Sequence, residues 1–151
     1  MTRGKAVKIL LVEDDAAHAE IVRRNLRQHR VANRIDHVAD GQAALDYLFG
    51  ADGQTGCIDG SPPDLILLDL RLPKVDGLEV LNRIKADPRA RQIPTVVLTT
   101  SAAESDLVSA YSNGACSYLV KPLDFESFGS LMKTFGYYWL AWNAFPDGDA
   151  S

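Results

Sequence analysis

Short apolar segments alternate along the chain with segments in which apolar residues recur at helical spacing. The first kind predicts buried strands in the segments 7–15, 64–69, 93–100 and 117–122, and a weaker alternation predicts another strand at 34–40. The second kind predicts helices at 16–30, 41–50, 77–87, 101–114 and 124–142. Five strands that alternate with five helices indicate a doubly wound α/β fold, a parallel sheet with helices on both faces.

Glycine, proline and capping residues set the limits of these elements. Gly50 and Gly114 follow helical segments and are expected to end them, and Asp124 is expected to cap the last helix. Ser101 and Glu104 have the spacing of a capping box. Residues 50–63 contain four Gly and two Pro, which predicts a loop.

Size, charge and cysteine content narrow the class of protein. The 151 residues fit one domain, 46% hydrophobic and 24% charged, and the net charge of −4 disfavours binding to nucleic acid or to an anionic membrane. There is neither an apolar run long enough to span a bilayer nor a signal-peptide pattern, so we expect a cytoplasmic protein. Cys57 and Cys116 lack metal-site spacing and are expected to be reduced thiols.

Charged and hydroxyl side chains stand at the ends of four predicted strands. They are Glu13, Asp14 and Asp15 after the first strand, Asp69 after the third, Thr99 and Thr100 at the end of the fourth, and Lys121 at the end of the fifth. In a doubly wound sheet the carboxyl ends of the strands form the ligand-binding edge. Clustered carboxylates repel one another and need a cation such as Mg²⁺, which prefers oxygen ligands. A carboxylate nucleophile, a cation, a lysine and a hydroxyl are what an acyl phosphate requires, which predicts phosphoryl chemistry.

Each of these residues also has a simple structural explanation. An acid at a strand end is commonly a helix cap, a threonine is ordinary strand material, and a lysine is commonly a solvated surface charge. Their coincidence at four strand ends favours a functional site.

The segments "LLVEDD", "DLILLDLRLPKVDG", "VVLTTS" and "YLVKP" together resemble the receiver domain of two-component response regulators. Thr99 and Lys121 follow Asp69 at the family's spacing of thirty and fifty-two residues. The resemblance covers about residues 6–135 of a single domain, with an aromatic extension and tail at about 136–151. It implies the CheY-like, flavodoxin-like fold: a five-stranded parallel sheet of order 2-1-3-4-5 with five helices.

The resemblance also implies a role for each matching residue. Asp69 resembles the phosphoacceptor that takes the phosphoryl group from a histidine kinase. Asp14 resembles the direct Mg²⁺ ligand and Glu13 the second acid, and the backbone carbonyl of Arg71 resembles the third protein ligand. Thr99 and Lys121 resemble the hydroxyl and the amine that contact the phosphoryl group.

Other matching positions concern switching and geometry. Tyr118 resembles the family's aromatic switch, with a half-exposed strand aromatic as the plain alternative. Pro122 resembles a proline that follows a cis peptide bond. Asp15 falls one place after the acidic pair and is expected to cap the first helix, and Pro73 and Gly77 resemble the turn into the third helix.

The C-terminal segment "FGYYWLAWNAF" is rich in aromatic residues. These side chains either fold back over the core or form an intermolecular patch, with Phe135, Tyr138, Trp139 and Trp142 as its predicted interface. With the long loop at 50–63, this segment resembles the stand-alone receivers that partner bacterial phytochromes, several of which are homodimers through the last strand and helix. The resemblance therefore implies a sensor histidine kinase partner, a bacterial phytochrome in the narrower form, and a switched protein-binding surface without an output domain.

Two other function classes compete with a phosphoacceptor that is not itself an enzyme. A phosphohydrolase with an aspartyl nucleophile places a second Asp two residues later as acid and base, but here Arg71 holds that position. A receiver that only binds partners is disfavoured because Asp14, Asp69, Thr99 and Lys121 are all present.

Overall fold

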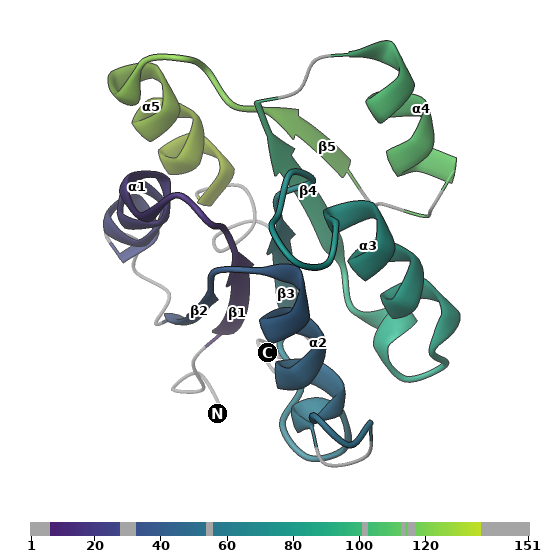
Figure 1. Ribbon diagram of the computed structural model, residues 1–151. Coiled ribbons are helices and arrows are strands. Elements are labelled where there is room, and N and C mark those ends of the chain that lie inside the picture. The colour runs from purple at the N-terminus through teal and green to yellow at the C-terminus, as the bar shows by residue number, and fades with distance from the viewer. Residues whose placement is uncertain are drawn as a thin grey trace, which may run out of the picture.

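The computed structural model describes residues 7–27, 33–53, 56–100, 103–112, 114 and 117–136. It contains one parallel sheet of order β2-β1-β3-β4-β5, which confirms the predicted order (Figure 1). The strands are β1 (Val7–Val12), β2 (Asn33–Val38), β3 (Leu65–Leu68), β4 (Thr95–Thr99) and β5 (Ser117–Val120). The helices are α1 (Ala16–Arg27), α2 (Gly41–Phe49), α3 (Gly77–Ala86), α4 (Glu104–Ser112) and α5 (Phe125–Gly136).

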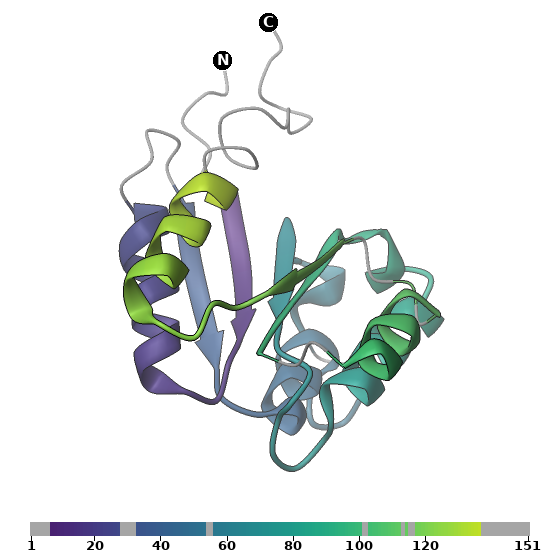
Figure 2. The same ribbon diagram turned by 90° about the horizontal axis from the view of Figure 1, so that it is seen from above.

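The helices form two layers, one on each face of the sheet. Figure 2 shows α1 and α5 on one side and α2, α3 and α4 on the other. Alternate side chains of β1 separate accordingly, because successive residues of a strand point to opposite faces. Ile9 and Leu11 pack in a cluster with α1 and α5, whereas Leu10 and Val12 pack in a second cluster with α2 and α3.

The central strands are buried on both faces, as their unbroken apolar sequences predict. All four residues of β3 and all five of β4 are buried. The strand that carries Asp69 at its end is therefore fixed by packing on both sides and by pairing with β1 and β4.

Capping agrees with the sequence where the structure describes it. The Asp124 carboxylate accepts from the backbone N–H of Ser127 at 2.7 Å, at the start of α5. Gly50 ends α2 with φ of 84°, a conformation that favours glycine. Ser101 lies outside the described residues, so its part in a capping box stays a prediction.

The segment 50–63 is more ordered than a plain loop where the structure describes it. It contains a 3₁₀ turn, η1 (Cys57–Asp59), and Ile58 is buried in the cluster beneath α2 and α3. Lys8 of β1 donates to the Ser61 carbonyl at 2.6 Å and so ties the segment to the sheet. A second 3₁₀ turn, η2 (Ala90–Gln92), leads into β4.

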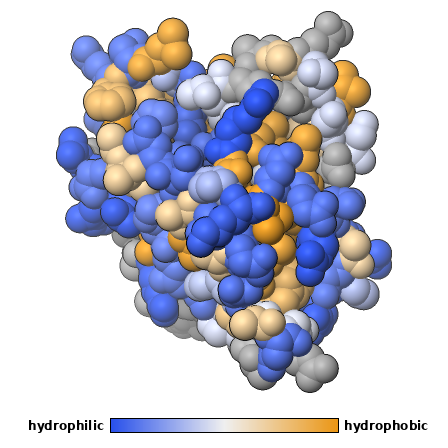
Figure 3. All heavy atoms as spheres, viewed as in Figure 1, coloured by the Kyte–Doolittle hydropathy of each residue, from blue (hydrophilic) through white to orange (hydrophobic). Residues whose placement is uncertain are grey.

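Polar residues cover most of the face shown in Figure 3, which also has apolar residues in its middle and near α5. Leu123 and Phe125 are exposed at the start of this helix, where Figure 3 shows apolar residues at the surface. None of the helices in the described part of the chain has the length and apolar character that crossing a bilayer requires.

Candidate functional site

The strand register brings the predicted site residues to one edge of the sheet. Val12 of β1 stands opposite Leu68 of β3, so Glu13 and Asp69 follow on neighbouring strands. The backbone N–H of Asp69 donates to the Val12 carbonyl at 3.0 Å and continues this pairing beyond the strand. On the other side, the Lys121 N–H donates to the Thr99 carbonyl at 2.8 Å.

Three carboxylates form a compact acidic cluster at this edge. Glu13, Asp14 and Asp69 each offer an oxygen, and these oxygens lie within 4.8 Å of one another. Glu13 is 1% exposed and Asp69 is 6% exposed, whereas Asp14 is open to solvent. The cluster thus has two buried carboxylates, those of Glu13 and Asp69, and an exposed rim formed by Asp14.

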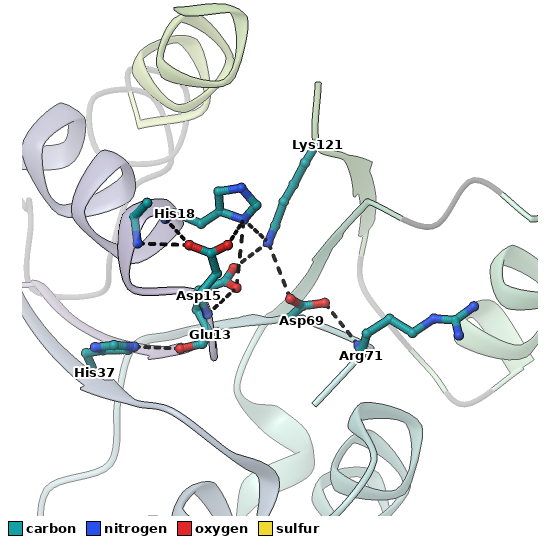
Figure 4. A network of polar contacts seen from close by, with 8 residues as sticks. Glu13, Asp15, His18, His37, Asp69, Arg71 and Lys121 are labelled. Atoms are coloured by element: carbon teal, nitrogen blue, oxygen red, sulfur yellow. Dashed lines mark hydrogen bonds and ion pairs between the residues drawn. The ribbon is translucent and has the colours of Figure 1, made fainter. Parts of the chain in front are cut away.

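Lys121 supplies the positive charge that faces this cluster (Figure 4). Its Nζ lies 2.5 Å from Glu13 Oε1 and 3.3 Å from Asp69 Oδ2. The side chain is almost fully buried, so these contacts are weakly screened by solvent. One ammonium facing three carboxylates leaves a net negative charge at the site.

Burial has its clearest electrostatic effect on Glu13. Loss of solvent raises the pKa of this carboxyl to about 7, against the opposing effect of the nearby Lys121 ammonium; the charge of Asp69 raises it further. Near neutral pH, Glu13 is therefore divided between its protonated and its ionised form.

Asp15 is a helix cap, as its position in the sequence predicts. Its Oδ1 accepts from the backbone N–H groups of Ala17 at 2.9 Å and His18 at 3.1 Å, at the start of α1. The N–H of His18 is the main cause that lowers the pKa of Asp15. This role leaves Glu13 and Asp14 as the acids of β1 that face Asp69.

The turn after β3 holds the other oxygen of Asp69. The backbone N–H of Arg71 donates to Asp69 Oδ1 at 3.0 Å, and Figure 4 shows the Arg71 side chain pointing away from the site. Gly77 begins α3 against this turn: a Cβ at Gly77 would lie 2.3 Å from the Asp69 carbonyl oxygen. The close approach explains why glycine is needed here.

Thr99 and Tyr118 lie on the β4–β5 side of the sheet. Thr99 is fully buried at the end of β4, one strand away from Asp69. Tyr118 of β5 is half-buried, packs against the cluster on the α2–α4 side, and has its ring centroid 6.3 Å from that of Tyr111. The movement of a switch requires a second state, so the switch roles of both residues stay predictions.

The sequence interpretation missed two histidines beside the site. His18 Nδ1 lies 3.0 Å from Lys121 Nζ, and His37 Nε2 lies 2.7 Å from the Glu13 carbonyl oxygen. A carbonyl only accepts, so His37 donates from Nε2 and fixes the backbone at Glu13. The signal for His18 was its place in the first turn of a helix that begins directly after the acidic strand end.

The peptide bond before Pro122 differs from the expected geometry. No cis peptide bond occurs among the described residues, so the bond before Pro122 is trans and the expected cis geometry is wrong for this structure. The trans form is the lower-energy isomer of an X–Pro bond, and the fold accommodates it here.

The predicted interface falls largely outside the described residues. Tyr138, Trp139 and Trp142 lie there, whereas Phe135 is described and is 8% exposed in the cluster beside α1 and α5. Phe135 is therefore mainly a core residue of its own chain, and the part of all four residues in an interface stays a prediction.

The donor set fits a hard divalent cation. Carboxylate oxygens from Glu13, Asp14 and Asp69 converge, and their negative charge exceeds what Lys121 balances. Mg²⁺ binds one or two carboxylates together with waters and phosphate oxygens, which suits a site with an exposed rim.

Comparison with known proteins decides the family. The family model described as "Response regulator receiver domain" matches residues 9–133. The chain belongs to the response regulator receiver family. The matched segment begins within β1 and contains the other four strands and the acidic cluster with Lys121.

Two curated proteins are similar to this chain over most of its length. The chain is 50% identical to "Probable methanogenesis regulatory protein FilR2" of Methanothrix harundinacea over 138 residues, which cover 91% of this chain and 86% of that protein. It is 39% identical to "Response regulator Rcp1" of Synechocystis, over 87% of this chain and 88% of that protein.

Solved receiver structures share the fold. The phosphorylated cyanobacterial phytochrome response regulator RcpA has a TM-score of 0.85 at 37% identity, over 94% of this chain and 99% of that one. The Mn²⁺-bound form of Rcp1 has a TM-score of 0.83 at 38% identity, over 92% of this chain and 98% of that one. One of these similar structures is thus that of a response regulator with a bound divalent metal.

Proposed function

We propose that this receiver accepts a phosphoryl group on Asp69 from a phosphohistidine of a sensor kinase, and that the modified state changes a protein-binding surface. The observation that carries the proposal is the contact of Lys121 Nζ with Asp69 Oδ2 at 3.3 Å, within a cluster that also includes Glu13 and Asp14. A nucleophilic carboxylate, a fixed cation and a metal-binding rim are the parts that this transfer needs.

The transfer exchanges one bond to phosphorus for another. A carboxylate oxygen of Asp69 forms the new P–O bond while the P–N bond to the kinase histidine breaks, and the electron pair of that bond stays with the imidazole. Lys121 and the hydroxyl of Thr99 would hold phosphoryl oxygens, and the buried walls would restrict water. We propose Mg²⁺ as the cation, held by Asp14, Asp69 and the Arg71 carbonyl, with Glu13 as the second acid; when bound, it supplies charge that neutralises phosphoryl oxygens.

The arrangement favours phosphoryl acceptance over an independent phosphohydrolase. That class needs an acid two residues after the nucleophile, and Arg71 stands there with its side chain directed away from Asp69 (Figure 4). The proposed protein is therefore a phosphoacceptor whose own residues assist its phosphorylation and dephosphorylation.

Phosphorylation of Asp69 is directly testable. Incubation with Mg²⁺ and radiolabelled acetyl phosphate is expected to give label that is stable in acid and released by hydroxylamine. Asp69→Asn is expected to stay unlabelled, whereas the control Asp76→Asn, at an exposed acid without a side-chain capping bond, is expected to label as the natural protein does. Labelling of Asp69→Asn to the same extent would contradict the proposal.

We also propose a sensor histidine kinase of the bacterial phytochrome class as the phosphodonor, acting in the cytoplasm. Support comes from the similarity to RcpA and Rcp1, while the more identical FilR2 is named for methanogenesis, so identity alone does not select a photoreceptor. Phosphotransfer from a purified phytochrome kinase is expected to be faster than from a histidine kinase without a photoreceptor. Equal rates from both would remove the phytochrome assignment and leave the receiver function intact.

We also propose that the protein is a homodimer that forms through the last strand and helix. Exposed apolar side chains line this side of the molecule on α4, β5 and the start of α5: Val108, Tyr111, Val120, Leu123 and Phe125. Apolar residues that cluster on a surface mark contact sites. Neither nucleic acid nor membrane is proposed as a partner, because the chain carries a net charge of −4.

A further inference from the structure

His18 lies between the acidic cluster and α5, next to the amine of Lys121 (Figure 4). Its Nδ1 is 3.0 Å from Lys121 Nζ, and its ring meets Phe125 and Phe128 edge-on, with centroid distances of 6.0 and 5.3 Å. The side chain is 18% exposed. The imidazole thus contacts Lys121 through Nδ1 and packs with its ring against α5.

The direction of the hydrogen bond between His18 and Lys121 follows from proton counting. A lysine ammonium has three N–H donors and no acceptor, so Nδ1 of His18 must accept and the ring proton must sit on Nε2. Burial, followed by the charge of Lys121, lowers the pKa of His18 and favours this neutral ring.

Three acceptors surround the Lys121 ammonium at different distances. They are Glu13 Oε1 at 2.5 Å, His18 Nδ1 at 3.0 Å and Asp69 Oδ2 at 3.3 Å. Three donors therefore meet three acceptors in a buried setting, where an unmet donor is costly. The longest of the three contacts is the one to the proposed phosphoacceptor.

We propose that His18 is a positioning residue for Lys121. Its Nδ1 and the Glu13 carboxylate each accept one N–H of the ammonium. The third N–H, which contacts Asp69, is then free to turn to an incoming phosphoryl oxygen. The inference rests on the proposed phosphorylation of Asp69. Without the imidazole acceptor, the ammonium is held by carboxylates alone, and its donor directions are less defined when the phosphoryl group arrives.

Two substitutions separate the acceptor of His18 from its ring. His18→Asn places an amide oxygen at the same number of bonds from Cα as Nδ1, but removes the ring from Phe125 and Phe128. His18→Phe keeps an aromatic ring against these side chains and removes the acceptor. A role in packing and a role in hydrogen bonding therefore predict opposite results.

The first measurement is the rate of Asp69 labelling by acetyl phosphate with saturating Mg²⁺. His18→Phe is expected to slow labelling about tenfold, equivalent to about 1.4 kcal/mol, while His18→Asn is expected to stay within about threefold of the natural protein. Normal rates in both variants, equal slowing in both, or slowing in His18→Asn alone would each overturn the proposal. Circular dichroism and thermal unfolding show whether each variant is folded.

The second measurement needs neither Mg²⁺ nor a phosphodonor. A ¹⁵N–¹H spectrum of the natural protein is expected to show a slowly exchanging Lys121 ammonium, identified by its loss in Lys121→Met, and long-range ¹⁵N couplings are expected to place the His18 proton on Nε2. The ammonium signal is expected to persist in His18→Asn and to broaden by faster exchange in His18→Phe. A His18 proton on Nδ1, or an ammonium signal that is unchanged in His18→Phe, would overturn the proposal.

Failure of the two ideas can be told apart. If the natural protein takes no label at all, the proposed phosphorylation of Asp69 is wrong, and the spectra still test whether His18 holds Lys121. If it labels normally and the spectra show no bond from Lys121 to His18, the positioning role alone is wrong.

Discussion

Replacing Lys121 with methionine keeps an aliphatic side chain of similar length and removes the ammonium that faces Glu13 and Asp69. The lost contacts with these two carboxylates are 2.5 and 3.3 Å long, and Lys121 is almost fully buried. Removal of one partner from a buried ion pair costs about 3–5 kcal/mol, because the remaining charge is buried without compensation.

Protonation of Glu13 reduces this cost near neutral pH. Its pKa is already about 7, and loss of the nearby positive charge raises it further, so the carboxyl can take up a proton at small cost. We therefore expect Lys121→Met to lower the free energy of unfolding by about 2 kcal/mol at pH 7 without metal.

The loss should grow as the pH rises. In the variant the folded state binds a proton at Glu13 that the unfolded chain, with a pKa near 4.5, does not bind. Stability then falls by about 1.4 kcal/mol for each pH unit, or about 2 kcal/mol between pH 7 and about pH 8.5. In the natural protein Glu13 is mostly ionised above its pKa of about 7, so the free energy of unfolding depends much less on pH in this range.

Urea denaturation at both pH values, with and without saturating Mg²⁺, measures these effects. Mg²⁺ replaces the missing positive charge, so the loss is expected to shrink to below about 1 kcal/mol when the metal is present. Lys133→Met, at an exposed lysine of α5, is the control and is expected to change stability by less than about 0.5 kcal/mol. A loss that is the same at both pH values and unaffected by Mg²⁺ would refute the electrostatic reasoning.

Four further predictions follow from the same geometry. Mg²⁺ binding at pH 7 should release about half a proton, because Glu13 with a pKa of about 7 becomes ionised beside the cation. Calorimetry in two buffers that differ in ionisation enthalpy measures this release. Glu13→Gln should remove it. Gly77→Ala should lower the free energy of unfolding in urea by at least about 2 kcal/mol, since its Cβ would lie 2.3 Å from the Asp69 carbonyl oxygen. Phe128→Ala should lower it by about 3–5 kcal/mol, because the side chain is 1% exposed and its loss leaves a cavity beside α1. Truncation after Phe135 should convert a dimer to a monomer in analytical ultracentrifugation.

Matched controls sharpen these measurements. Gly60→Ala meets no atom within 4 Å and should be nearly neutral, and Phe125→Ala, at a residue that is 57% exposed, should cost less than about 1 kcal/mol. Equal effects of Gly77→Ala and Gly60→Ala, or of Phe128→Ala and Phe125→Ala, would contradict the packing argument. Proton release that persists in Glu13→Gln would assign it to another group. A dimeric mass that is unchanged after truncation would exclude the C-terminal aromatic residues from the dimer interface, and a monomeric natural protein would contradict the dimer.

The sequence predicts the fold and the strand-end acids well because their signals are local. An unbroken apolar run such as 65–68 requires burial on both faces, and a parallel sheet brings the residues after such runs to one edge. Glu13, Asp69 and Lys121 therefore come together as the resemblance implied.

What the sequence did not predict depends on side-chain geometry across the sheet. The contact of His18 with Lys121 depends on how α1 packs beside the end of β5, which the place of His18 in the first turn of α1 does not reveal by itself. Burial of Ile58 in a glycine-rich loop was missed for a similar reason, since local composition indicated a turn while the space beneath α2 and α3 was filled by a distant residue. The trans bond before Pro122 shows that a family feature need not carry over with its motif.

The bond between Glu13 and Lys121 joins residues that are 108 positions apart in the chain. On the proposed role of Lys121, a kinase would meet a complete acceptor site only after synthesis has passed the fifth strand and β5 has paired with β4. Chains that end before the fifth strand, or that fold only in part, would lack this amine at the proposed site. Under the proposed function, phosphoryl uptake would therefore depend on complete folding and would serve in the laboratory as a count of fully native molecules.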